Sequence, residues 1–252
     1  MFKIKLMNNQ SYILERTNAK TVVLMIHGIL GTPRHFDFLM PYINEDCAIY
    51  NILLKGHGSD ALNFAHSSMD AWKCQVEECF LDLAIKYQEI IIVAHSMGGL
   101  FAIELALKYP TKIKTLYLLQ PALKIGPKTR LFSDCLKIYF NLVKEDDYKA
   151  NALIKASSIK LDPKFYHYLL WLPRYLELFK EASLVSKKVN KLKTKTYVYI
   201  SDDDEMVSRR VDTCFVGLSN VTIRHLKTST HDYYAEADQR IIIEDFKIVN
   251  KV

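Results

Sequence analysis

The sequence predicts an α/β fold in which helices flank a mostly parallel central sheet that carries a helical cap insertion. Two observations predict this fold class. Between residues 21 and 119, and again after residue 195, short apolar β-branched segments alternate with helical segments, as in proteins with a buried parallel sheet. From Ala122 to Asn190 this alternation stops, and helix-forming and aromatic residues predominate over a length too great for a loop. We therefore expect a core domain formed by residues 1–121 and 191–252 and a helical cap formed by residues 122–190.

The composition of the 252 residues is that of a globular protein, with 50% hydrophobic and 25% charged residues. The net charge of +6 is not accompanied by a nucleic-acid-binding motif, so we expect no nucleic-acid partner. No apolar stretch approaches the ~20 residues that a membrane span requires. We therefore expect no integral membrane segment, and a monomer or weak homodimer.

The five cysteines indicate a reducing compartment. Their number is odd, they form no CxxC or Cys/His metal spacing, and most lie among apolar residues. We expect them to be buried free thiols. The amino terminus also lacks an apolar segment of signal-peptide length, so we expect a cytoplasmic location.

The amino-terminal part of the core is predicted to contain three strands. Phe2–Met7 and Ser11–Glu15 are predicted to form a hairpin, followed by a buried strand at Thr21–Ile26. This third strand leads into the glycine-rich loop His27–Pro33, whose backbone can approach a ligand closely. A helix is expected from His35 to Ile43.

The next strand, Cys47–Leu53, ends in a loop that contains His57. Because parallel strands end at one edge of a sheet, this loop is expected beside the glycine-rich loop. We favour a structural role for His57 and keep pocket lining as the alternative. A long helix follows from Ser67 to Tyr87, with Ser67 or Ser68 as its cap and Trp72 in its core-facing stripe.

A strand–serine–helix turn follows and is the centre of the sequence. The apolar run Ile90–Val93 predicts a buried strand, and a helix is expected from Met97 onward. Ser96 lies between them with small neighbours, Ala94 and Gly98, that make a tight turn possible. The turn would hold the Ser96 hydroxyl at the sheet edge beside free N–H groups of the helix, so that the Met97 N–H can stabilise an oxyanion. An ordinary turn that happens to contain serine is the alternative.

A strand is expected at Ile113–Leu119, before the cap begins. The aromatic and leucine-rich cap must face something apolar, and a hydrophobic acyl site beneath it is a reasonable expectation. The segment 169–179, which contains Trp171, is the best candidate for the wall of that site.

After the cap, the strand Thr196–Ile200 ends in four consecutive acids, Asp202 to Glu205. An acid in this position can orient a catalytic histidine, and Asp203 and Asp204 are both candidates. Consecutive acids on one loop cannot all face one ion, so we do not favour a metal site, and we expect the remaining acids to face solvent. A helix from Ser208 to Val216 and a last strand at Val221–Leu226 then lead to His231, and a helix from Gln239 to Asn250 closes the chain.

Nearly the whole chain resembles the bacterial carboxylesterases and monoacylglycerol lipases of the α/β-hydrolase superfamily. The residues that carry the resemblance are His27–Pro33, Lys55–Gly58, Ser67–Trp72, Ala94–Gly99, the Asp204 loop and His231. Two positions depart from the family pattern: Ala94 replaces the usual first glycine of the serine turn, and Thr230 precedes the histidine in place of glycine or serine.

The resemblance implies a catalytic triad of Ser96, His231 and Asp204, because the family has an acid three residues after a small turn residue and three before a valine. It also implies an oxyanion hole formed by the backbone N–H groups of Ile29 and Met97. Gly28, His57 and Trp171 are the candidate substrate contacts. Neither a metal ion nor an organic cofactor is expected.

The function implied is that of a serine carboxylesterase acting on short- to medium-chain carboxylic esters or monoacylglycerols. Hydrolysis of another acyl bond, such as an amide or a carbon–carbon bond, is the enzymatic alternative, because this fold supports many reactions. A non-catalytic binding protein on the same fold is a less favoured alternative, since such proteins usually lack one member of the triad.

Overall fold

The computed structural model describes residues 9–250, which form a seven-stranded sheet in the order β1-β3-β2-β4-β5-β6-β7. β1 pairs antiparallel with β3, and every other neighbouring pair is parallel. The predicted mostly parallel α/β sheet is therefore confirmed. The strands are β1 (Tyr12–Leu14), β2 (Thr21–Ile26), β3 (Cys47–Ile52), β4 (Glu89–His95), β5 (Ile113–Leu119), β6 (Thr196–Ser201) and β7 (Val221–Leu226).

The predicted amino-terminal hairpin is only partly testable. Its first strand, Phe2–Met7, lies outside the described residues. Its second strand is present as β1, which pairs with β3 through Ile13 and Tyr50.

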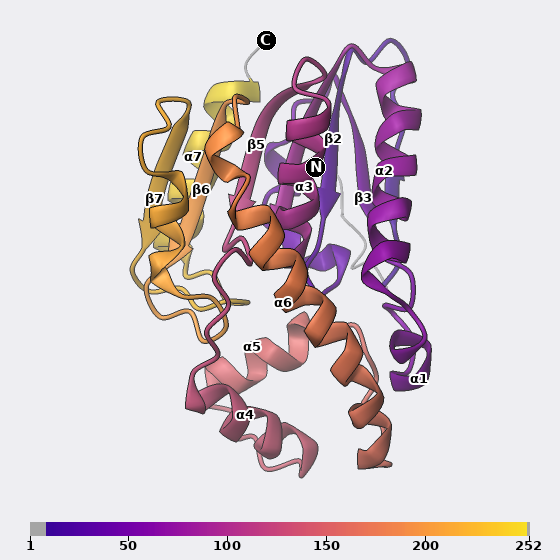
Figure 1. The fold of residues 1–252 in the computed structure, drawn as a ribbon, viewed down its shortest axis with the longest axis vertical. Coiled ribbons are helices and arrows are strands. Elements are labelled where there is room, and N and C mark those ends of the chain that lie inside the picture. Colours follow the sequence, from indigo (N-terminus) through magenta and orange to yellow (C-terminus); the bar gives the residue numbers. More distant parts are fainter. Residues whose placement is uncertain (1–8, 251–252) are drawn as a thin grey trace.

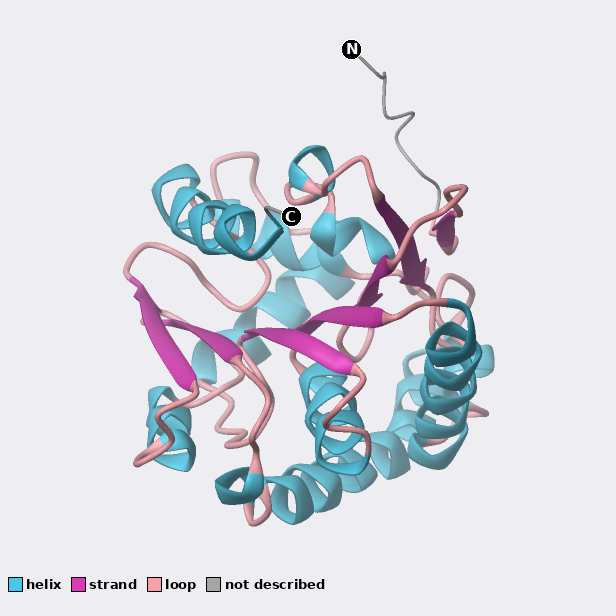
Figure 2. Ribbon diagram, turned by 90° about the horizontal axis from the view of Figure 1, so that it is seen from above, coloured by secondary structure: helices cyan, strands magenta, loops and turns pink. Residues whose placement is uncertain are grey.

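The sheet is covered by helices on both faces, as Figure 2 shows. Leu24 and Ile92 contribute to a core on the face that carries α2 and α3. Val23 and Tyr117 contribute to a second core on the face that carries α7. Burial of both faces explains why the central strands are continuously apolar in sequence. The helices are α1 (Ala61–Ala65), α2 (Met69–Lys86), α3 (Met97–Lys108), α4 (Thr129–Tyr139), α5 (Tyr148–Ala156), α6 (Leu172–Ser186) and α7 (Glu236–Asn250).

Two of the predicted helices are wrong. The segment His35–Ile43 forms two short 3-10 helices, Pro33–Phe36 and Met40–Tyr42, in place of one α-helix. Pro41 explains this, because a proline inside an α-helix removes a hydrogen bond and clashes with the preceding turn. The segment after Ser208 is likewise a 3-10 helix, Arg209–Phe215, whose valine, aspartate and threonine are weak helix formers.

The region 122–190 contains α4, α5 and α6 together with a 3-10 helix, Phe165–Trp171, and no strand, although Ile125 makes an isolated bridge to Val207. In Figure 1, α4 and α5 lie beyond one end of the sheet, and α6 runs diagonally from that end toward α3. The assignment of this region as a separate cap domain stays a prediction. It carries many exposed apolar side chains, among them Phe132, Leu136, Phe140, Phe165, Leu169, Leu172 and Leu176.

The expected burial of the cysteines is mostly wrong. Cys47 is buried in β3, but Cys74 and Cys135 are exposed and the other two are partly buried. Cys74 lies on α2 and Cys135 on α4. All five are free thiols.

None of the helices in residues 9–250 combines the length and the apolar character that crossing a bilayer requires.

Candidate active site

Ser96 lies at the junction of β4 and α3, in the tight turn that the sequence predicts. Its φ angle is 50°, a left-handed value that residues with a side chain rarely adopt. Gly98 permits the turn, because a Cβ at this position would lie 2.3 Å from the carbonyl oxygen of Ile26. The start of α3 therefore packs directly on the end of β2. This junction lies between β2 and β4, where the chain reverses its direction across the sheet and where ligands bind in folds of this type.

The structure brings Ser96, His231 and Asp204 into one chain of hydrogen bonds. His231 Nε2 lies 2.9 Å from Ser96 Oγ, and His231 Nδ1 lies 2.8 Å from Asp204 Oδ2. All three side chains are buried. The second oxygen of Asp204 accepts hydrogen bonds of 2.7 Å from the backbone N–H groups of Met206 and Val207, which fix the orientation of the carboxylate.

Two opposing effects act on the pKa of His231. Burial alone lowers it, but the charge of Asp204 and its hydrogen bond outweigh burial and raise the pKa to about 9. Asp232 and Glu205 add to the increase through their charges. The imidazolium form of His231, which arises when the imidazole accepts a proton, is therefore strongly stabilised.

The sequence predicts that the other acids of this loop face solvent, but Glu205 and Asp203 instead bind other residues of the protein. Glu205 is buried; its carboxylate accepts hydrogen bonds from the backbone N–H of His231 at 3.2 Å and from Arg130 at 3.1 Å. Asp203 is partly exposed and forms ion pairs with Arg130 and Lys149. Arg130 lies on α4 and Lys149 on α5, so both acids connect the site to region 122–190.

The glycine-rich loop after β2 lies directly against Ser96. A Cβ on Gly28 would lie 2.8 Å from the Cβ of Ser96, so only glycine fits there without displacement. His57 holds this loop from the side: its Nε2 accepts a 3.1 Å hydrogen bond from the N–H of Leu30, and its Nδ1 lies 3.3 Å from the carbonyl of Lys55. Both ring nitrogens of His57 are thus engaged with backbone groups, which favours the structural role over pocket lining. Ile29, the expected oxyanion donor, lies between Gly28 and Leu30.

Trp171 is buried where region 122–190 meets α1. Its indole N–H donates a 2.9 Å hydrogen bond to the carbonyl of Ala61, and its ring packs against Phe64 and Tyr168. Met97, the other expected oxyanion donor, is the first residue of α3. The first N–H groups of a helix, that of Met97 among them, have no partner within the helix.

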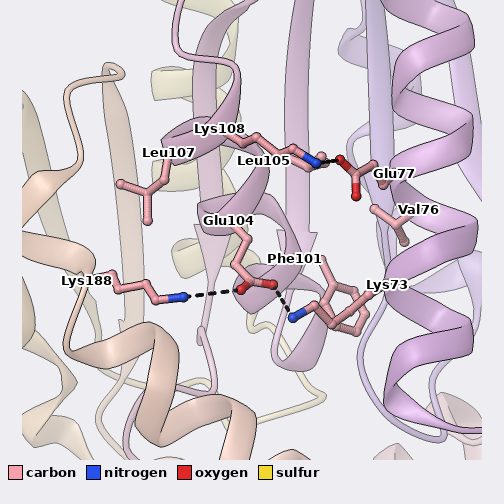
Figure 3. Close-up of a pocket in the computed structure, with 9 residues that line it drawn as sticks. All are labelled: Lys73, Val76, Glu77, Phe101, Glu104, Leu105, Leu107, Lys108 and Lys188. Carbon is pink, nitrogen blue, oxygen red and sulfur yellow. Dashed lines mark hydrogen bonds and ion pairs between the residues drawn. The ribbon is translucent and has the colours of Figure 1, made fainter.

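A pocket of about 410 Å³ opens on the outer side of α2 and α3, away from Ser96. Figure 3 shows that charged and apolar side chains both line it, with Glu104 between Lys73 and Lys188. The Glu104 carboxylate lies 2.8 Å from the Lys73 ammonium and 3.8 Å from that of Lys188. No residue of the segment 169–179 lines this pocket, so it is not the acyl site that the sequence led us to expect.

Sequence reasoning missed a second group of titratable side chains beside Ser96 and His231. His35, His95 and Asp232 each place one potential ligand atom within 4.8 Å of the others. Burial lowers the pKa of His35 to about 3 and that of His95 well below its usual value, and it raises the pKa of Asp232 to about 6. The one available signal was position, because His95 directly precedes Ser96 and Asp232 directly follows His231.

Fold and site together define the class of protein: a hydrolase with the α/β-hydrolase fold. A family model described as "Serine aminopeptidase, S33" (Hydrolase_4) matches residues 17–238. The chain belongs to this family.

Individual relatives agree with this class. A protein described as a thermostable monoacylglycerol lipase, from Bacillus sp. (strain H-257), is 25% identical over 240 residues, which cover 90% of this chain and 89% of the relative. Two solved structures share the fold. One, described with LipS and LipT, two metagenome-derived lipolytic enzymes, has a TM-score of 0.74 at 16% identity and covers 97% of this chain and 98% of its own. The other, a monoacylglycerol lipase of Paleococcus ferrophilus, has a TM-score of 0.68 at 16% identity, with 95% and 98% covered.

Proposed function

We propose that this protein is a serine carboxylesterase that hydrolyses short- to medium-chain carboxylic esters or monoacylglycerols through a Ser96–His231–Asp204 triad. The observation that carries the proposal is the continuous hydrogen-bonded chain from Ser96 Oγ through the imidazole to Asp204. A serine activated in this way is a nucleophile suited to acyl transfer.

In the first step, Ser96 Oγ attacks the ester carbonyl carbon while His231 Nε2 accepts the hydroxyl proton. The carbonyl electrons move to the oxygen, and the backbone N–H groups of Ile29 and Met97 stabilise the resulting oxyanion. The tetrahedral intermediate collapses, the bond to the alcohol oxygen breaks, and His231 gives its proton to the leaving alcohol. Asp204 stabilises the imidazolium throughout.

In the second step, water releases the acyl group. His231 takes a proton from the water as its oxygen attacks the acyl-enzyme carbonyl. The second tetrahedral intermediate collapses, the carboxylic acid leaves, and the proton on His231 returns to Ser96 Oγ.

Two observations support the ester substrate class. The relative from Bacillus is described as a monoacylglycerol lipase, and it matches along most of both chains. Region 122–190 also supplies an abundance of apolar side chains on the side of the sheet edge where Ser96 lies, which suits an acyl chain. Gly28, whose backbone lies directly against Ser96, is the proposed backbone contact of the substrate, and Trp171 is the aromatic residue proposed for the acyl-site wall.

The test is hydrolysis of p-nitrophenyl esters from acetate to palmitate by the wild type, by Ser96→Ala and by Ser219→Ala. Ser219 is an exposed serine in the turn before β7 and serves as the matched control. We expect Ser96→Ala to lower kcat by about 10⁴-fold or more, and Ser219→Ala to leave kcat unchanged. Equal rates in the wild type and Ser96→Ala would contradict the proposal.

Amide hydrolysis is the second candidate, and the family description as a serine aminopeptidase favours it. The same variants assayed with amino-acid p-nitroanilides separate the two. A kcat/KM for an anilide above that for the best ester would move the assignment from esterase to peptidase while keeping Ser96 as the nucleophile.

A further inference from the structure

The acid loop, residues 202–205, contacts His231 twice, and the proposed hydrolysis uses only one of these contacts. Asp204 binds the imidazole ring, with its Oδ2 2.8 Å from His231 Nδ1. Glu205 binds the main chain instead, because its Oε2 accepts a hydrogen bond of 3.2 Å from the backbone N–H of His231. Glu205 is only 2% exposed, so water has little access to this second contact.

The carbonyl group of His231 is held as well. His95 Nε2 lies 3.0 Å from the His231 carbonyl oxygen, and because a carbonyl can only accept, His95 donates this hydrogen bond. His95 directly precedes Ser96 at the end of β4. The main chain of His231 is thus attached to the strand that leads to the nucleophile and to the loop that carries Asp204. Both attachments help to place His231 Nε2 at 2.9 Å from Ser96 Oγ.

Arg130 of α4 compensates the charge of the buried Glu205 carboxylate. Its Nη2 lies 3.1 Å from Glu205 Oε2, the same oxygen that accepts from the His231 N–H. Burial of a carboxylate is unfavourable unless hydrogen bonds and a counter-charge accompany it. The main chain of Glu205 is also fixed, since its carbonyl accepts a 2.8 Å hydrogen bond from the N–H of Lys128. Glu205 is therefore a rigid support for the residue that it binds.

We propose that Glu205 is a positioning residue for His231, acting through the backbone N–H of this base. The inference rests on the proposed function, because it assumes that His231 is the base that activates Ser96. Loss of the Glu205 acceptor should displace the imidazole and lower kcat, whereas KM should change little because the contact is made to the main chain of His231. A residue needed only for folding would change neither kcat nor the pH dependence of the folded protein.

Glu205 also acts on His231 through its charge. The titratable groups around the His231 ring come from four segments of the chain: Asp204, Glu205, Asp232, His95 and His35. Burial lowers the pKa of His231, and the three carboxylates raise it. Burial keeps the two neighbouring imidazoles neutral at pH 7, because it lowers their pKa values far below 7. Replacing Glu205 with neutral glutamine should therefore lower the pKa of His231.

The experiment compares the wild type with Glu205→Met, Glu205→Gln and Asp202→Asn in the hydrolysis of p-nitrophenyl butyrate, from about pH 6 to about pH 10. Methionine has a similar length to glutamate but no oxygen to accept the His231 N–H, whereas glutamine keeps an acceptor oxygen and removes the charge. Asp202 is the matched control, because it is an acid of the same loop that pairs with Arg209 and His225.

We expect Glu205→Met to lower kcat at least about tenfold with little change in KM. Glu205→Gln should keep kcat within about threefold of the wild type, while its pH profile of kcat/KM moves to lower pH. Asp202→Asn should match the wild type in both. Circular dichroism checks that each variant is folded, and Glu205→Gln provides the test if Glu205→Met is not. Wild-type kcat in folded Glu205→Met, or a wild-type pH profile in Glu205→Gln, would overturn the proposal.

NMR titration of protein labelled with ¹⁵N-histidine measures the pKa of His231 without any substrate, which separates this inference from the proposed function. His231→Gln assigns the resonance. If the wild type hydrolyses no ester, the proposed function fails, and the titration still gives a result for Glu205. A lower His231 pKa in Glu205→Gln than in the wild type would support the contact, and equal pKa values would overturn it.

Discussion

At the scale of single residues, His231 combines burial with an unusually acidic environment. Asp204 lies 2.8 Å from its Nδ1, and Glu205 accepts a hydrogen bond from its backbone N–H. Because the neutral imidazole is the form that accepts the Ser96 proton, the environment that raises its pKa also sets the pH at which the base is available.

This environment predicts an alkaline pH dependence. With a His231 pKa of about 9, the imidazole is mostly protonated at neutral pH, so kcat/KM for p-nitrophenyl butyrate should rise with pH and level off above about 9. Asp204→Asn removes the largest effect that raises this pKa, so it should move the rise to lower pH and reduce kcat by on the order of 10³–10⁴-fold. The measurement is the pH–rate profile of both proteins.

Asp203→Asn is the matched control for that prediction. Asp203 pairs with Arg130 and Lys149, away from the imidazole, so its replacement should leave the position of the rise unchanged and alter kcat only mildly. If Asp203→Asn proves the more damaging change, the assignment of the triad carboxylate is wrong by one residue.

At the scale of elements, the contact between α3 and β2 depends on the absence of a side chain at Gly98. A Cβ there would lie 2.3 Å from the carbonyl oxygen of Ile26 and 2.8 Å from that of His27. Gly98→Ala should therefore lower the free energy of unfolding by about 1–3 kcal/mol, because both neighbours are backbone atoms that cannot rotate away. Urea denaturation measures the change.

Gly126→Ala is the control for the α3 contact. A Cβ at Gly126 would lie 3.8 Å from Ser208, an ordinary contact distance, so we expect no loss of stability. Equal destabilisation by the two substitutions would mean that the loss at Gly98 comes from something other than the close approach to β2.

A second element-scale contact joins α4 to the acid loop through Arg130 and Glu205. Arg130→Met leaves the buried Glu205 carboxylate without its cation, which should lower the free energy of unfolding by about 2 kcal/mol. Arg209→Met removes an exposed ion pair with Asp202 of similar length, 3.1 Å, and should cost less than about 1 kcal/mol. Denaturant titration compares the two, and a larger loss in Arg209→Met would contradict the stabilising role of the buried pair.

At the scale of the whole molecule, four histidines make stability sensitive to acid. Burial lowers the pKa of His27 to about 4 and that of His35 to about 3, and it lowers those of His57 and His95 well below their usual value. An unfolded histidine has a pKa of about 6.5, so below that pH the unfolded chain binds more protons than the folded one. The free energy of unfolding therefore falls as pH falls.

The expected slope is up to about 1.4 kcal/mol per pH unit for each histidine between its unfolded and folded pKa values. Asp232 opposes the trend below pH about 6, because its raised pKa makes the folded state bind a proton more readily. His231 contributes stability below pH 6.5 that is lost as pH rises through about 9. Urea denaturation at pH 7 and pH 5 measures the combined effect of these groups on the free energy of unfolding. Equal free energies of unfolding at pH 7 and pH 5 would contradict the prediction.

Local patterns in the sequence determined the order of the strands and helices and the position of the serine turn. They also contain the motifs by which the chain resembles its family. Short apolar runs specify buried strands wherever they fall, and a serine between small residues at a strand–helix junction has few alternative conformations, so β2 to β7 and Ser96 were predictable. The single helix predicted over His35–Ile43 was wrong, because Pro41 within this segment favours two short 3-10 helices over one α-helix.

Only the tertiary structure decided how distant side chains meet. It decided which of four consecutive acids faces His231, because that depends on how the loop after β6 turns against the loop after β7. It also buried Glu205 against Arg130, 75 residues away in the chain, and gathered His35, His95 and Asp232 from three segments. Such contacts arise from the packing of elements against one another, and neither periodicity nor spacing along the chain encodes them.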